Sequence, residues 1–135
     1  MWGGGVSGGG GGALASGMML FREFGFEAAH WLPHVPAGHK CARMHGHSYR
    51  FVVYVRGEIG ERSGWVMDFS EMRKIVDPVV EELDHRCLNE VKGLENPTAE
   101  RITKWLWERI RPGLPGMYRI ELRETAKCGC VYEGE

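Results

Sequence analysis

The sequence predicts an α+β fold in which two helices cover one face of an antiparallel four-stranded sheet, in the order ββααββ. Three observations predict it. Apolar residues alternate with polar ones along 20–30, 45–57 and 117–125, as in half-buried strands. They recur at helical spacing along 70–83 and again after residue 98. Prolines and glycines separate these segments and mark the loops.

The first two elements are long strands, 20–30 and 45–57, which we expect to pair as an antiparallel hairpin. Residues 31–43 contain two prolines and a glycine, and this composition predicts a long loop between them. In both strands one face is mostly apolar but carries histidines at the end nearest the loop. That face comprises Leu20, Phe24, Phe26, Ala28 and His30 in the first strand, and His45, His47, Tyr49, Phe51, Val53 and Val55 in the second.

A helix over 70–83 follows, with Ser70 or Asp68 as the residue that caps its N-terminus. A short strand is expected just before it, over 65–69. Pro78 lies inside the helical pattern and should kink or divide the helix. The predicted buried face comprises Met72, Ile75, Val76, Val79 and Leu83.

A second helix is expected to open at Asn96-Pro97-Thr98, with a capping residue and a proline in the first turn, and to end at Pro112. A strand over 117–125 returns, and Cys130-Val131-Tyr132 forms a last short strand. The apolar positions are Ile102, Trp105, Leu106 and Ile110 in the helix, and Tyr118, Ile120, Leu122 and Glu124 on one face of the strand.

The length of 135 residues supports a single domain over 18–135, preceded by a glycine-rich tail over 1–17. Eight of the 20 glycines lie between Gly3 and Gly12, and such chain loses too much entropy on ordering to fold by itself, so we expect disorder. The tail lacks the positive and apolar regions of a signal peptide. A soluble cytoplasmic protein is therefore expected.

The composition also excludes two classes of partner. No stretch approaches the ~18 to 20 apolar residues of a membrane span, so no membrane is expected. A net charge of -1 does not give the basic footprint of a nucleic-acid-binding protein. The cysteines, which include no C-x-x-C pair, should be reduced thiols; they are Cys41, Cys87, Cys128 and Cys130.

Histidines that end the paired strands form the first candidate site. His45 and His47 stand two residues apart on a strand, so both imidazoles leave one face about 7 Å apart at the Cα level, and pairing can bring His30 alongside. Three histidines without a fourth protein ligand are typical of an open zinc site, although scattered surface histidines are the simpler alternative. His34 and His39, in the loop, are expected to be solvated.

Three further features could carry chemistry. Cys41 lies four residues before His45 and could be a nucleophile or base, or an inert buried thiol. Asp84-His85 could be an acid/base pair, or simply the cap of the preceding helix. Glu124 occupies a position where the strand pattern predicts an apolar residue, so it either binds a ligand that bears N–H groups or reaches solvent at the strand end.

These pieces, in this order, resemble the 6-pyruvoyl-tetrahydropterin synthase/6-carboxy-tetrahydropterin synthase superfamily over about residues 21–132. The resemblance implies a T-fold (tunnelling fold). The matching segments are Phe26-Glu27-Ala28-Ala29-His30, His39-Lys40-Cys41, His45-Gly46-His47-Ser48-Tyr49, Val66-Met67-Asp68-Phe69, Leu83-Asp84-His85, Asn96-Pro97-Thr98-Ala99-Glu100 and Glu124-Thr125.

The resemblance also assigns roles. The family's ligands for one zinc ion per chain fall on His30, His45 and His47. Its catalytic residues fall on Cys41, Asp84, His85 and Glu124, and Glu124 also anchors the pterin substrate. Lys40, Arg43, Arg50, Lys104 and Arg123 are all eligible to hold the substrate's triphosphate.

Within the superfamily the chain looks like the bacterial carboxy-tetrahydropterin branch. The pyruvoyl branch usually places its cysteine six residues before the first histidine of HGH and follows HGH with Asn. Here Cys41 precedes His45 by four residues, and Ser48 follows His47. A cysteine moved along the loop would approach a different carbon of the substrate.

The implied activity is that of a carbon–carbon lyase. It converts 7,8-dihydroneopterin triphosphate to 6-carboxy-5,6,7,8-tetrahydropterin, acetaldehyde and triphosphate, a step toward 7-deazapurines of the queuosine type. The family also implies self-association into a trimer or hexamer with sites between subunits. The alternatives are 6-pyruvoyl-tetrahydropterin synthase activity and a non-catalytic zinc- or pterin-binding module.

Overall fold

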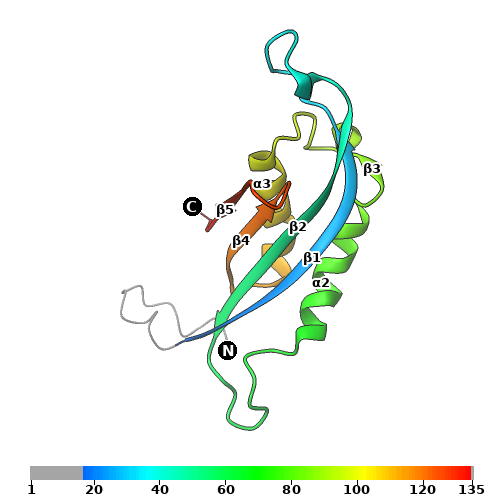
Figure 1. The fold of residues 1–135 in the computed structure, drawn as a ribbon. Helices are drawn as coiled ribbons and strands as arrows, with labels where there is room; N and C mark the ends of the chain where they lie inside the picture. The colour runs from blue at the N-terminus through cyan, green and yellow to red at the C-terminus, as the bar shows by residue number, and fades with distance from the viewer. Residues whose placement is uncertain (1–16, 135) are drawn as a thin grey trace.

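The structure, a computed structural model, describes residues 17–134. The predicted disorder of residues 1–17 therefore concerns a segment that lies, except for Gly17, outside the described residues. The helices and strands, in chain order, are β1 (Met18–His30), β2 (His45–Gly57), α2 (Phe69–Glu81), β3 (Arg86–Cys87), α3 (Ala99–Ile110), β4 (Met117–Arg123) and β5 (Gly129–Tyr132) (Figure 1).

One sheet contains all five strands, in the order β3-β1-β2-β4-β5. The predicted hairpin is confirmed: β1 and β2 pair antiparallel over their whole length, from Met18 opposite Gly57 to His30 opposite His45. β4 and β5 continue the antiparallel pattern, and β5 confirms the predicted last strand.

The predicted four-stranded antiparallel sheet in ββααββ order is wrong in one respect. β3 pairs parallel with Ala28 and Ala29 of β1, which makes the sheet mixed and the order ββαβαββ. β3 has only two residues, too few for alternation to be visible in sequence. β3 follows soon after the end of α2, and it reaches β1 only through the tertiary packing of the chain.

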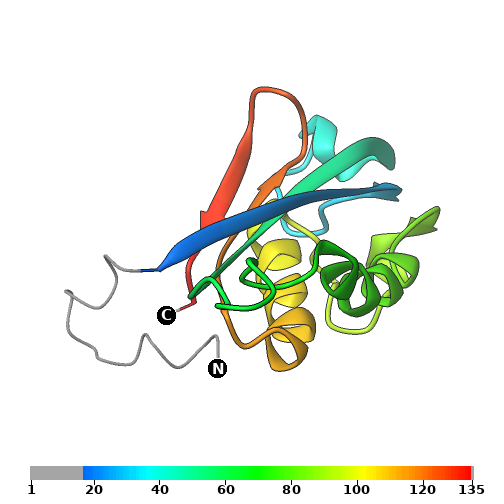
Figure 2. The ribbon, with the colours of Figure 1, turned by 90° about the horizontal axis from the view of Figure 1, so that it is seen from below.

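Both helices cover the same face of the sheet, here called the inner face, and the opposite one is the outer face (Figure 2). The predicted apolar faces of β1, β2 and the helices form the core between these layers. Its members include Phe24, Phe26, Tyr49, Phe51, Val53, Val55, Met72, Val76, Leu83, Ile102, Leu106, Ile110, Ile120 and Leu122.

The alternation predicted for β4 fails at its first residues. The pairing with β2 shifts between Tyr54 and Val55, and this irregularity turns Met117 into the core in place of Tyr118. Tyr118 lies instead beside Tyr54, with the Arg56 guanidinium 4.2 Å from its ring centroid. A local shift in pairing depends on the partner strand, so periodicity in β4 alone could not predict it.

α2 begins as expected, because the Asp68 side chain caps it by accepting the Ser70 N–H. The short strand expected over 65–69 does not form: residues 65–67 are bends, Asp68 is the cap, and Phe69 is the first residue of the helix. Pro78 does not divide the helix, which is continuous from Phe69 to Glu81. No described helix is long and apolar enough to cross a membrane.

α3 starts later than expected. Thr98, rather than Asn96, caps the helix by accepting the Arg101 N–H, and Pro97 lies outside it. The helix ends at Ile110, before a 3-10 turn that contains Pro112, as predicted. The later start leaves the carbonyl of Pro97 free for a contact in the site described next.

Candidate active site

The strand pairing brings three histidines together on the inner face, at the end of the β1–β2 hairpin. His45 lies opposite His30, and His47 lies opposite Ala28, two residues earlier on β1. One ring nitrogen from each histidine falls within 4.8 Å of the other two, and the ring centroids are 4.5 to 5.1 Å apart. This separation is small enough for one metal ion to bind all three side chains.

Backbone carbonyls fix the orientation of two of these rings. Nδ1 of His30 donates to the Pro97 carbonyl, and Nδ1 of His45 donates to the Arg43 carbonyl, each at 2.8 Å. A carbonyl can only accept, so Nδ1 carries the proton and Nε2 keeps its lone pair. Nε2 of His30 and of His47 is buried without a hydrogen-bond partner. The Nε2 of His30 is thus both oriented and without a hydrogen-bond partner, as expected of a metal ligand.

Burial also favours the form of the histidines that binds a cation. His30 is only 1% exposed, and loss of hydration lowers its pKa; the same cause lowers the pKa of His47. Tyr49 lies below the cluster, fully buried, with its hydroxyl 3.2 Å from Nδ1 of His30. Burial, and then the charge of Glu124, raise the pKa of Tyr49, which therefore stays neutral.

Glu124 lies beside the histidine cluster. Its Oε2 is 3.7 Å from Nε2 of His30, and its side chain is 26% exposed. The β4–β5 turn holds its backbone, because the Glu124 N–H donates to the Cys128 carbonyl at 3.1 Å. The carboxylate thus lies between the cluster and solvent, where a bound molecule could contact Glu124 and the histidines at once.

Asp84 and His85 lie against the edge of β1. Asp84 accepts the Glu27 N–H at 2.9 Å with one oxygen, and its other oxygen is 3.1 Å from Nδ1 of His85. These bonds lower the pKa of the Asp84 carboxyl, the Glu27 bond most. The His85 N–H donates in turn to the Glu27 carbonyl. One strand residue therefore orients the pair through its backbone, and leaves the imidazole exposed.

The structure does not bring this pair into contact with the histidine cluster. Within residues 17–134, no hydrogen bond or ion pair joins Asp84 or His85 to the three histidines or to Glu124. His85 and His47 do line a common groove of about 570 Å³, which also contains Glu27 and Ser48.

Cys41 lies half-buried in the β1–β2 loop, in a 3-10 turn over Lys40–Ala42. Its N–H donates to Nδ1 of His39 at 3.0 Å, and its carbonyl accepts the Leu32 N–H at 2.8 Å. The bond with Leu32 holds the cysteine near the end of β1, which carries His30. None of the four cysteines forms a disulfide. The predicted exposure of His34 and His39 is confirmed.

Sequence reasoning missed the groups that support the site. Two are backbone carbonyls, of Arg43 and Pro97, and nothing in a sequence reports where a carbonyl points. Glu27 acts on Asp84 and His85 through its backbone as well. Tyr49 was expected on the face of His47 from the alternation, but its contact with His30 was not predicted.

The chain is similar in sequence to proteins whose activity is named. The family profile described as 6-pyruvoyl tetrahydropterin synthase matches residues 19–135. A 6-carboxy-5,6,7,8-tetrahydropterin synthase of Synechocystis is 42% identical over 120 residues, 84% of this chain and 92% of the relative. A dihydroneopterin monophosphate aldolase of Pyrococcus furiosus is 46% identical over 93 residues, 67% of this chain and 78% of the relative.

A solved structure gives the same result for the fold. The 6-pyruvoyl tetrahydropterin synthase of Caenorhabditis elegans superposes with a TM-score of 0.82 at 27% identity, over 88% of this chain and 96% of that one. The α+β T-fold expected from the sequence is therefore shown, with its sheet mixed and five-stranded.

Proposed function

The chain belongs to the 6-pyruvoyl tetrahydropterin synthase family, and from that premise we propose that it converts 7,8-dihydroneopterin triphosphate and water to 6-carboxy-5,6,7,8-tetrahydropterin, acetaldehyde and triphosphate. Such a carbon–carbon lyase would supply a precursor of 7-deazapurines. The observation that carries the proposal is the cluster of His30, His45 and His47, in which Nε2 of His30 and of His47 is buried without a hydrogen-bond partner. The 42% identity to a relative of that name supports the choice of reaction.

Zinc is the metal that suits the donor set. Three neutral imidazoles without a carboxylate among them match an open zinc site better than the iron triad of two histidines and a carboxylate. His30, His45 and His47 would hold the ion. When bound, it would supply Lewis-acid polarisation of oxygens in the substrate's side chain.

The other site residues would transfer protons or bind the substrate. Cys41, as a thiolate, would take and return protons at the side-chain carbons of the substrate. His85, held by Asp84, would be its acid/base partner. Glu124 would accept hydrogen bonds from the amino and ring N–H groups of the pterin, in charge-assisted contacts.

The sheet itself supports self-association. β3 covers only Ala28 and Ala29 of β1, so within the described residues the backbone groups along that edge of β1, from Met18 to Phe26, have no strand beside them. An uncovered edge of this length pairs readily with another strand. We propose that further copies of the chain cover it, in a trimer or hexamer, and that Asp84 and His85 of one copy serve the histidine cluster of the next.

Product identification tests the reaction. The purified protein is incubated with 7,8-dihydroneopterin triphosphate, and the pterin and aldehyde products are identified by mass. We expect 6-carboxy-tetrahydropterin with acetaldehyde in equal amounts. A 6-pyruvoyl product without acetaldehyde would instead assign the pyruvoyl activity. In a parallel incubation with dihydroneopterin monophosphate, cleavage of that compound alone would assign the aldolase activity of the Pyrococcus relative. Metal or pterin binding without turnover of either compound would leave a binding module.

A further inference from the structure

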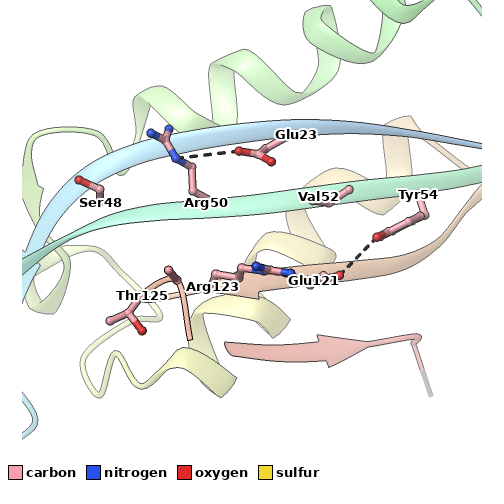
Figure 3. A pocket seen from close by; sticks show the side chains of 9 residues that line it. Glu23, Ser48, Arg50, Val52, Tyr54, Glu121, Arg123 and Thr125 are labelled. Atoms are coloured by element: carbon pink, nitrogen blue, oxygen red, sulfur yellow. Dashed lines mark hydrogen bonds and ion pairs between the residues drawn. The ribbon is translucent and has the colours of Figure 1, made fainter. Parts of the chain in front are cut away.

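His39, in the β1–β2 loop, is a polar side chain to which the proposed reaction assigns no role. On the outer face of the sheet, side chains without such a role pair with one another, as Arg50 does with Glu23 at 3.9 Å (Figure 3). His39 binds the backbone instead, because its Nδ1 accepts the N–H of Cys41 at 3.0 Å. Cys41 is the residue proposed to transfer protons, so this contact bears directly on the site.

The contact caps the 3-10 turn over Lys40–Ala42, which carries the cysteine. His39 precedes the turn in an extended conformation, and its carbonyl accepts the Ala42 N–H at 3.0 Å. The N–H of Cys41, the second residue of the turn, has no acceptor inside so short a turn. The usual capping residues Asn, Asp, Ser and Thr supply a side-chain oxygen at this place, and here the imidazole supplies Nδ1.

Different groups hold the carbonyl end of Cys41. This carbonyl accepts the Leu32 N–H at 2.8 Å. Next to Leu32, the Asn89 amide holds both backbone groups of Trp31, accepting the N–H at 3.0 Å and donating to the carbonyl at 2.8 Å. The carbonyl end of Cys41 is thus anchored near the end of β1 without any help from His39.

The N–H end of Cys41 depends on His39. Within residues 17–134 this N–H has no other hydrogen-bond partner. We propose that His39 is a positioning residue, whose Nδ1 fixes the Cys41 backbone and so directs the thiol. A group that transfers protons must stay within hydrogen-bond reach of the substrate, and a turn released at one end no longer keeps it there. The task given to the thiol rests on the proposed function, whereas the contact itself does not.

Two substitutions at His39 separate this role from other uses of the ring. Oδ1 of asparagine and Nδ1 of histidine are both bonded to Cγ, so His39→Asn keeps an acceptor for the Cys41 N–H and removes Nε2. His39→Ala removes the acceptor as well. His34→Ala, at an exposed histidine of the same loop, is the matched control. The variants are compared only if their thermal unfolding midpoints agree.

Alkylation by iodoacetamide reports the setting of Cys41 without any turnover. The full-length protein is alkylated for a short time and digested, and the labelled fraction of each cysteine is measured by mass, with the exposed Cys128 as internal standard. Cys41 is half-buried, so release of the turn in His39→Ala should raise its alkylation rate about fivefold, the factor that corresponds to losing one cap. His39→Asn and His34→Ala should react as the unchanged chain does.

Kinetics with the pterin triphosphate test the consequence for the reaction. His39→Ala should lower kcat about tenfold at unchanged KM, because the thiol is misplaced while the histidine cluster and Glu124 are untouched. His39→Asn should restore most of that loss. The proposal is wrong if His39→Ala matches His34→Ala in both measurements. It is also wrong if His39→Asn turns over as slowly as His39→Ala, since the ring would then act through a group other than Nδ1. A chain that turns over no pterin refutes the proposed function, and the alkylation rates still decide whether His39 holds Cys41.

Discussion

At the scale of single residues, His30 shows how much of a site depends on its supporting contacts. The ring is 1% exposed, its Nδ1 proton is engaged by the Pro97 carbonyl, and its Nε2 faces the other histidines. Desolvation lowers its pKa and keeps it neutral. Burial and one backbone contact thus prepare this nitrogen as a ligand before any metal arrives.

Cys41→Ala should abolish turnover without releasing the metal. The thiol belongs to the β1–β2 loop and is not one of the three clustered ligands, so metal content should stay unchanged. Loss of a proton-transferring group lowers kcat by roughly 100-fold or more. Acetaldehyde release and metal content are measured on the same sample. Cys128→Ala, at an exposed thiol, is the control and should keep normal turnover; near-normal release from Cys41→Ala would remove that residue from the mechanism.

At the scale of elements, the connection after α2 determines where Asp84 and His85 lie. His85 is the one non-glycine residue with positive φ among the described residues, at 61°. Its N–H bonds to Glu27, and Asp84 binds the same strand residue, so contacts with β1 hold a left-handed conformation that an L-residue adopts at a cost. Strain of this kind persists where neighbouring structure enforces it.

His85→Gly and His85→Ala separate the strain from the chemistry. Both remove the imidazole and its contact with Asp84, so both should lose turnover. Only glycine adopts the positive φ freely, and the glycine variant should be more stable than the alanine variant by about 1 kcal/mol. Urea unfolding of the two variants measures that difference in free energy. Equal stabilities would mean that the left-handed backbone costs nothing here.

At the scale of elements, long segments with a clear hydrophobic pattern could be predicted from the sequence, and very short ones could not. The alternation over 20–30 and 45–57, which belong to β1 and β2, predicted the hairpin and the convergence of His30, His45 and His47. β3 has two residues, and its place depends on a tertiary contact. Thr98 and Asn96 are both good capping residues, so the start of α3 was ambiguous in sequence. The contacts of the Pro97 carbonyl with His30 and of the Arg43 carbonyl with His45 could be seen only in the folded chain.

At the scale of the whole molecule, two observations support the proposed self-association. The edge of β1 has no strand beside it from Met18 to Phe26 within the described residues, and Asp84 and His85 make no contact with the histidine cluster of their own chain. The pair lies on the edge where the proposed second copy would pair. A heterologous contact of this kind repeats until the rotation closes a ring. The proposed ring would complete each site with residues from two copies.

Mixing inactive variants tests this arrangement. Chains carrying Cys41→Ala and chains carrying His85→Ala are unfolded together and refolded in equal amounts. If each site draws Cys41 and His85 from different copies at random, about a quarter of the sites regain both residues and activity returns to that level. Light scattering gives the mass of the assembly. A mixture as inactive as either parent would place both residues of each site in the same chain.

The central claim, that the three clustered histidines hold a metal on which pterin turnover depends, has a direct test. Metal content, acetaldehyde and pterin product are measured before chelation, after chelation and after zinc is restored, for the unchanged chain and for His47→Ala. We expect one zinc ion per chain, production of 6-carboxy-tetrahydropterin that stops on chelation and returns with zinc, and neither metal nor turnover in His47→Ala. Full turnover by the chelated protein, or normal zinc binding by His47→Ala, would contradict the account.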